Sequence, residues 1–215
     1  CIRDRDAGAL GFSTSRTFLH KVPDGRFVPG THAEAEELLA FAEVMAQYKG
    51  TVFEAAAKLG GKDSREEIKM YGDISRLAGC PVTFGLTQVD IAPQLHLQIL
   101  DYVEEENALG ADLHPQTTSK HIGVLLGLSA RTPFDRAEGW AEMTDLPLEE
   151  KIARMSNSET REMLITAAEE RLESLPLDWG KFYALPDDPV RHDLRPEESV
   201  AAKAEKRGVS IPEQW

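Results

Sequence analysis

The feature that most constrains this sequence is an alternation of short apolar segments with longer amphipathic segments between residues 9 and 116. The short segments have the length and composition of β-strands, and the segments between them have the apolar spacing that is typical of helices. We predict four strands, at residues 9–13, 51–56, 81–86 and 111–116. This order of strands and helices predicts βα units and a parallel sheet.

Residues that favour helix ends bound each predicted helix. Thr31 and Glu34 have the spacing of a capping box before the first helix, and Asp63 is the predicted cap of the second. A glycine follows each of the three helices, at Gly50, Gly79 and Gly110. Because glycine readily takes the left-handed conformation that ends a helix, these positions support the predicted boundaries.

Two α/β architectures fit this pattern, an open doubly wound sheet and a (β/α)8 barrel. In both, we expect strands that are covered on both faces and therefore read as continuous apolar runs. Neither GxGxxG nor GxxxxGK[ST] follows a predicted strand, so a nucleotide-binding open sheet lacks support. A whole barrel needs eight strands and about 250 residues. The four units therefore predict part of a TIM-like barrel.

The pattern changes after residue 117, where no clear strand follows. We predict a helix in LPLEEKIARM capped by Asp145, a helix in NSETREMLITAAEERL capped by Asn157 or Ser158, and a short helix at 197–207. The predicted organisation is therefore residues 1–120 as central βα units of a hydrolase barrel. Residues 121–215 would be a helical and irregular continuation of the same catalytic domain.

Charge and cysteine content limit the partners and the compartment. The net charge is −13 and the isoelectric point about 4.9, which argues against nucleic acid and anionic membranes because both select positive surfaces. No apolar run approaches the roughly 20 residues that span a bilayer. Cys1 and Cys80 are too few for a disulfide framework, so we expect a cytoplasmic protein.

Polar side chains near the carboxyl ends of the predicted strands are the candidate site, because functional groups of parallel α/β folds gather there. They form a polar ring suited to a small polar substrate. The predicted substrate-binding residues are Ser13, Thr14, Arg16, Glu54, Gln88, His114 and Gln116.

Five of these residues also have a structural interpretation. Ser13 and Thr14 could satisfy backbone groups where the strand turns. Arg16 suits a substrate carboxylate through its bidentate guanidinium, or it could be a surface ion-pair partner. Glu54 either faces a polar mouth or forms an outward salt bridge, and His114 is either a ligand or acid–base group, or a structural histidine. No HxH, HExxH or GxSxG motif is present.

Several segments, in order, resemble the amidohydrolase superfamily and its N-acyl-D-amino-acid deacylase (D-aminoacylase-like) branch. The resemblance covers roughly residues 6 to 155 and is most specific in GALGFSTSRT followed by PGTHA and an ELL helix. The other segments that carry it are PVTFGLTQ, GADLHPQTT and KHIGVLLGL. It implies a metal-dependent hydrolase on a (β/α)8 barrel, usually with zinc, that cleaves an amide-type C–N bond of a small substrate.

The family's metal ligands are an HxH after the first barrel strand, a Cys, two His on middle strands and a late Asp. By the resemblance, the HxH and Cys would lie before residue 1 and the Asp beyond Trp215. The two middle-strand His positions are replaced here, near Phe53–Lys58 and near Gly85–Gln88. The resemblance therefore implies zinc or another divalent metal in a longer protein, held mostly by ligands outside this chain. It assigns no metal ligand here.

Three functions remain open at this stage. The first is a fragment of an amidohydrolase that acts on an N-acyl-D-amino acid or similar small substrate, one that can bear a carboxylate, with metal-activated water. The second is a binding or regulatory protein that kept the barrel and lost the metal site. The third is a barrel hydrolase of esters or lactones.

Overall fold

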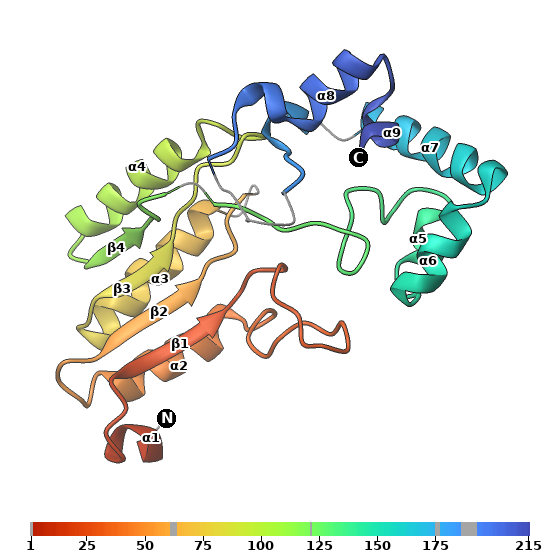
Figure 1. The fold of residues 1–215 in the computed structure, drawn as a ribbon. Coiled ribbons are helices and arrows are strands. Elements are labelled where there is room, and N and C mark those ends of the chain that lie inside the picture. Colours follow the sequence, from red (N-terminus) through yellow and green to blue (C-terminus); the bar gives the residue numbers. More distant parts are fainter. Residues whose placement is uncertain (1, 61–63, 121, 175–176, 186–192) are drawn as a thin grey trace. The chain divides into compact units, whose positions relative to one another are not determined.

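The structure is a computed structural model that describes residues 2–60, 64–120, 122–174, 177–185 and 193–215. The chain divides into two compact units, residues 1–122 and 123–215. The first unit holds four parallel strands in the order β1-β2-β3-β4 (Figure 1). They are β1 (Gly11–Ser15), β2 (Val52–Ala56), β3 (Val82–Gly85) and β4 (Leu113–Gln116). The predicted α/β class with a parallel sheet is confirmed.

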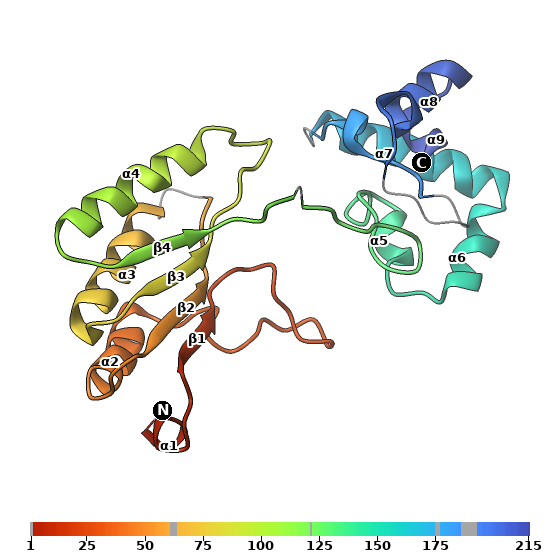
Figure 2. The same ribbon diagram turned by 60° about the vertical axis from the view of Figure 1, so that its left-hand side comes forward.

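The helices that connect the strands cover one face of this sheet, as Figures 1 and 2 show. They are α2 (Ala35–Met45), α3 (Ser64–Ala78) and α4 (Leu95–Ala108), and a short helix α1 (Ile2–Asp6) precedes β1. Phe53, Val82 and Leu113 point from the sheet into the helix layer and are almost fully buried. The core of the first unit therefore lies between the sheet and the three helices.

The strands alternate between buried and accessible residues, so the expected continuous apolar runs are wrong. Glu54 follows the buried Phe53 and is exposed, and His114 follows the buried Leu113 and is exposed. Successive side chains of a strand point to opposite faces, so one face of the sheet is apolar and the other polar. β1 also begins two residues later than predicted, and Leu10 is left 81% exposed.

Two predicted helix caps are corrected, and one lies outside the described residues. Thr31 does not cap α2, because its hydroxyl donates to the carbonyl of Val28 and the helix begins only after Glu34. Asp145 does not cap α6 (Leu148–Met155), because Pro147 occupies the cap position. Asn157 caps α7 (Ser158–Glu173) as predicted, accepting the Thr160 N–H at 2.9 Å. Asp63 falls outside the described residues.

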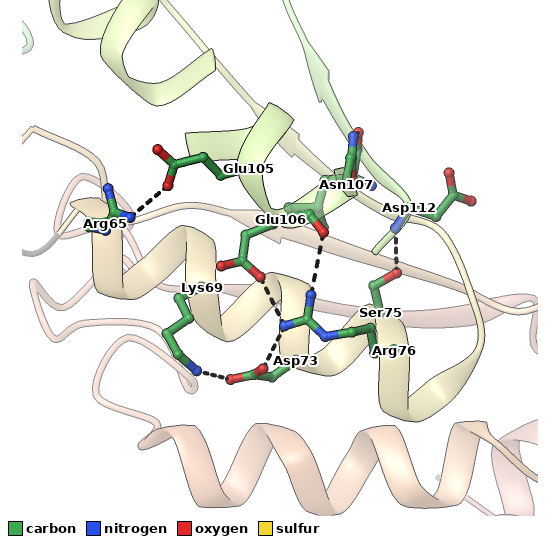
Figure 3. Close-up of polar contacts among 10 residues, drawn as sticks. Arg65, Lys69, Asp73, Ser75, Arg76, Glu105, Glu106, Asn107 and Asp112 are labelled. Atoms are coloured by element: carbon green, nitrogen blue, oxygen red, sulfur yellow. Dashed lines mark hydrogen bonds and ion pairs between the residues drawn. The ribbon is translucent and has the colours of Figure 1, made fainter. Parts of the chain in front are cut away.

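Charged side chains join α3 to α4 on the outside of the helix layer (Figure 3). Arg76 donates to Asp73 at 2.7 Å and to Glu106 at 2.9 Å, and Lys69 donates to Asp73 at 2.6 Å. Burial would raise the pKa of Asp73, but the hydrogen bonds from Lys69 and Arg76 hold it below its ordinary value. Beneath this network, the buried Ser75 hydroxyl accepts the N–H of Asp112 and so fixes the start of β4.

Gly11 is required where β1 meets β2. A Cβ atom at this position would lie 1.9 Å from the carbonyl oxygen of Val52, a distance that forces the strands apart. We expect Gly11→Ala to lower the free energy of unfolding by about 1–3 kcal/mol, as overpacking does. Gly85→Ala in β3 is the matched control, because its Cβ would meet no atom within 4 Å. Urea unfolding followed by circular dichroism checks this, and equal losses for the two variants would contradict it.

The second unit is helical and packs around aromatic rings. The buried Phe134 contacts Trp140, Trp179 and Trp215, with ring centroids 5.1 to 5.8 Å apart. Besides α6 and α7, the unit contains α5 (Trp140–Met143), α8 (Val200–Arg207), α9 (Ile211–Gln214) and the 3-10 turns η1 (Trp179–Lys181) and η2 (Pro196–Glu198). The predicted helix near 197–207 is thus present. Across the described part of the chain, no helix has the length and apolar character to cross a membrane.

Candidate functional site

Four polar side chains form a row across the helix-free face of the sheet, one from each strand. Ser13 pairs in register with Glu54, Glu54 with Thr83, and Thr83 with His114. Neighbouring strands lie about 4.8 Å apart, so these side chains stand next to one another along the row. Ser13, Glu54 and His114 are exposed and Thr83 is partly exposed. We call this set the polar row.

The β4 end of the polar row is held by hydrogen bonds. His114 Nε2 lies 2.6 Å from Asp112 Oδ1, and the hydroxyl of Thr83 donates to the His114 carbonyl at 3.0 Å. Gln116 stands two residues further along β4, on the same face and in register with Gly85. The structure therefore brings together four of the predicted residues, Ser13, Glu54, His114 and Gln116.

Thr14 lies apart from the polar row, because successive residues of β1 point to opposite faces. Its hydroxyl abuts Gly30 in the loop between β1 and α2. A Cβ on Gly30 would lie 2.5 Å from Thr14 Oγ1, and the φ of Gly30 is +93°, so glycine is needed there for two reasons. Thr14 therefore packs against the loop that contains Gly30.

Arg16 points away from the polar row and forms an ion pair with Glu67 of α3. Its Nε donates to both carboxylate oxygens of Glu67, at 2.8 and 3.0 Å, and its Nη1 donates to the Ala33 carbonyl. The two side chains are only 13% and 5% exposed. The sequence left open a surface ion pair for Arg16, and the structure instead forms a largely buried one.

Glu67 accepts two further hydrogen bonds. The Lys58 N–H donates to it at 3.2 Å and the Tyr71 hydroxyl at 2.7 Å. Burial, with the nearby Glu67 carboxylate, raises the pKa of Tyr71, so the hydroxyl keeps its proton and remains a donor. Glu67 thus joins the loops after β1 and β2 to helix α3, beneath the ends of the strands.

Gln88 lies in the exposed loop that follows β3, next to an antiparallel bridge between Val89 and Ala92. It extends neither the polar row nor the Arg16 ion pair. Gln88 therefore follows the carboxyl end of a strand, as predicted, but it does not lie beside the other predicted residues.

Some polar residues near the site were not predicted from the sequence. Thr83 joins the polar row through strand register, and Asp112 is placed by its contact with His114. The hydroxyl of Ser15, a strand-end residue that the sequence does point to, lies 2.7 Å from His20 Nδ1. A groove of about 900 Å³ runs beside Ser15 and His20, and Lys21 and Glu37 also line it.

The polar row can bind and orient a small polar molecule through two hydroxyls, a carboxylate and an imidazole. A metal centre needs more than this row offers, because a catalytic zinc usually has about three protein ligands. Among the described residues, no three His, Cys, Asp or Glu side chains form a group that could hold a metal ion. The described part of this chain therefore does not fit a complete metal centre.

Comparison of the chain with protein-family models, with curated proteins and with solved structures gave no match.

Proposed function

We propose that residues 1–122 are an arc of a (β/α)8 barrel and that the polar row faces its interior. Two features of the sheet support this. The strand order follows the chain without reversal, and α2, α3 and α4 lie on one face. A doubly wound sheet instead carries helices on both faces and reverses its strand order at a switch point.

The proposed reaction is hydrolysis of an amide-type C–N bond in an N-acyl-D-amino acid or a similar small substrate, in the cytoplasm. The observation that carries the proposal is the polar row, since a barrel interior that only filled space would hold branched apolar side chains instead. The resemblance of GALGFSTSRT to the N-acyl-D-amino-acid deacylases supplies the reaction class. β1 contributes both the resemblance and the first residue of the row.

Within this proposal, the row binds the polar part of the substrate. Ser13 and Thr83 offer hydroxyls, Glu54 accepts hydrogen bonds from substrate N–H groups, and His114 can donate or accept. The substrate carboxylate is not assigned to Arg16, because Glu67 and Ala33 already engage its Nε and Nη1. Arg16 is a positioning residue that holds the loop after β1.

Zinc or another divalent metal is part of the proposed function, with ligands from barrel strands outside the described residues. The described residues do not supply its site. The part of this chain in the reaction is therefore to bind and orient the substrate.

The test is hydrolysis of N-acetyl-D-amino acids by the full-length gene product with zinc supplied. We expect Glu54→Gln and His114→Gln to lower kcat/KM by at least tenfold, the range for losing one or two strong substrate hydrogen bonds. Glu43→Gln, an exposed change on α2, is the control and should leave kcat/KM unchanged. A metal-loaded protein that hydrolyses neither N-acyl amino acids nor cyclic amides would refute the reaction class.

A second function is a barrel protein that binds its ligand without catalysis. The observation that favours it is the lack of a three-residue metal group among the described residues. Metal analysis of the purified full-length protein separates the two proposals. Stoichiometric zinc supports the hydrolase, and a metal-free protein that still binds an N-acyl amino acid supports the second function.

A further inference from the structure

The polar row offers a ligand mostly hydrogen-bond acceptors. A carboxylate can only accept, so in the 2.6 Å contact with Asp112 Oδ1 the proton lies on His114 Nε2. In a neutral imidazole, Nδ1 is then an acceptor. The hydroxyl of Thr83 already donates to the His114 carbonyl, so it presents its lone pairs to a ligand. With the carboxylate of Glu54, three of the four side chains in the row act as acceptors.

The negative charge of the row has no cation to pair with inside the sheet. The four strands contain neither lysine nor arginine. Across the described part of the chain, the Glu54 carboxylate takes part in no hydrogen bond or ion pair. Lys21 lines the same groove as Glu54, but its ammonium lies over the ring of Phe27, 5.2 Å from the centroid. Glu54 is therefore open to a cation from outside the protein.

The spacing of the row suits an organic cation better than a metal ion. Neighbouring strands lie about 4.8 Å apart, so Glu54, Thr83 and His114 are spread over about 10 Å. In the described residues, no three potential metal ligands are grouped closely enough to hold an ion. An ammonium carries three N–H donors and a guanidinium five, so either can bond several acceptors of the row.

We propose that the polar row selects a ligand with a cationic side chain, an ammonium or a guanidinium, and rejects an acidic one. The inference rests on the proposed function and names its substrate class, N-acyl amino acids with basic side chains. The cation would donate to Glu54, to Thr83 Oγ1 and to His114 Nδ1. In the barrel interior it would also offset the cost of removing the Glu54 carboxylate from water.

The test compares three probes that differ only in the side chain. They are the methylamides of N-acetyl-D-lysine, N-acetyl-D-norleucine and N-acetyl-D-glutamate, in which the side chain carries the only charge. Each is added to the isotope-labelled 215-residue chain and followed by NMR. We expect the lysine probe to bind at least about tenfold more tightly than the norleucine probe, the range for one hydrogen bond to a charged group. The glutamate probe should bind most weakly.

Substitutions of Glu54 make the test specific. Glu54→Gln should bring the affinities for the lysine and norleucine probes close together, and Glu54→Lys should favour the glutamate probe. Glu43→Gln removes the same charge from an exposed position on α2 and should leave the lysine preference unchanged. Equal affinity of the parent for lysine and norleucine, or a lysine preference that survives in Glu54→Gln, would refute the proposal.

Asp112 is a positioning residue in this proposal, and the imidazole nitrogen shifts of His114 report its role. The parent should show the proton on Nε2. Asp112→Ala removes the acceptor of that proton, so we expect a mixture of the two tautomers and a smaller lysine preference. A tautomer that is unchanged in Asp112→Ala would overturn the role of Asp112.

Hydrolysis by the full-length protein separates this inference from the proposed reaction. We expect kcat/KM for N-acetyl-D-lysine to exceed that for N-acetyl-D-glutamate by about tenfold or more, because like charges oppose binding of the acidic substrate. Hydrolysis of both substrates at equal rates would refute the selectivity and leave the reaction class standing. Selective binding of the lysine probe by a protein that hydrolyses no N-acyl amino acid would support the selectivity and refute the reaction.

Discussion

The variant Glu67→Ala is expected to lose about 3–5 kcal/mol of stability in residues 1–122, the usual cost of removing one partner of a buried ion pair. The substitution leaves the Arg16 guanidinium largely buried without its carboxylate, and it removes the acceptor of the Lys58 N–H and the Tyr71 hydroxyl. Since natural domains are stable by only about 5–15 kcal/mol, this is a large share of the stability of the unit.

The location of the tryptophans allows this loss to be assigned to one unit. Trp140, Trp179 and Trp215 all lie in residues 123–215, so tryptophan fluorescence reports only the second unit. In urea, Glu67→Ala should shift the transition seen by far-ultraviolet circular dichroism and leave the fluorescence transition in place. Glu66→Ala, an exposed neighbour on α3, should shift neither. A parent-like circular dichroism transition in Glu67→Ala would contradict the role given to Glu67.

The α/β class, the parallel sheet and the approximate strands could be predicted because they depend on local patterns. Apolar runs and helix-ending glycines are both readable within a dozen residues. Gly79, for example, directly follows α3 and has a φ of +60°, the conformation expected of a glycine that ends a helix. Strand ends were less accurate, as Leu10 shows.

The candidate site was only partly predictable, because it depends on register and on distant partners. Glu54 was recognised as a carboxylate within a strand, but its alignment with Ser13 and His114 follows from pairings that no local pattern encodes. Arg16 and Glu67 are 51 residues apart in sequence, and the apolar spacing of α3 predicts a helix but gives no partner for Glu67. The same residue types that suit a substrate carboxylate also suit an internal one, so only the fold could decide between them.

The sequence also did not predict that only one face of the sheet is buried. One large phenylalanine in each of β1, β2 and β3 makes the segment look apolar throughout. The residues next to these phenylalanines are Ser13 in β1, Glu54 in β2, and Thr83 and Gly85 in β3. Period-two alternation is hard to recognise in strands of four or five residues when small residues separate the large ones. The polar face is therefore the feature that the structure adds to the sequence.

The variant Phe134→Ala should have the opposite signature to Glu67→Ala. Phe134 is fully buried and its ring contacts three tryptophans, so its removal leaves a cavity at the centre of the second unit. Truncating a buried phenylalanine typically costs about 3–5 kcal/mol. We expect the fluorescence transition in urea to move to lower concentration, with loss of near-ultraviolet circular dichroism from the released tryptophan rings.

The matched control for Phe134→Ala is Ile152→Ala, an apolar truncation at a position that is 50% exposed in the same unit. It should shift the fluorescence transition by much less, because little new cavity forms.

The circular dichroism of Phe134→Ala should retain a transition at the urea concentration where residues 1–122 unfold in the parent. If that transition moved together with the fluorescence, the two units would unfold as one cooperative body, because independent units add their stabilities without coupling. Separate transitions in both variants would show that the helical unit does not hold the sheet together, and that the polar row is supported by the first unit's own core.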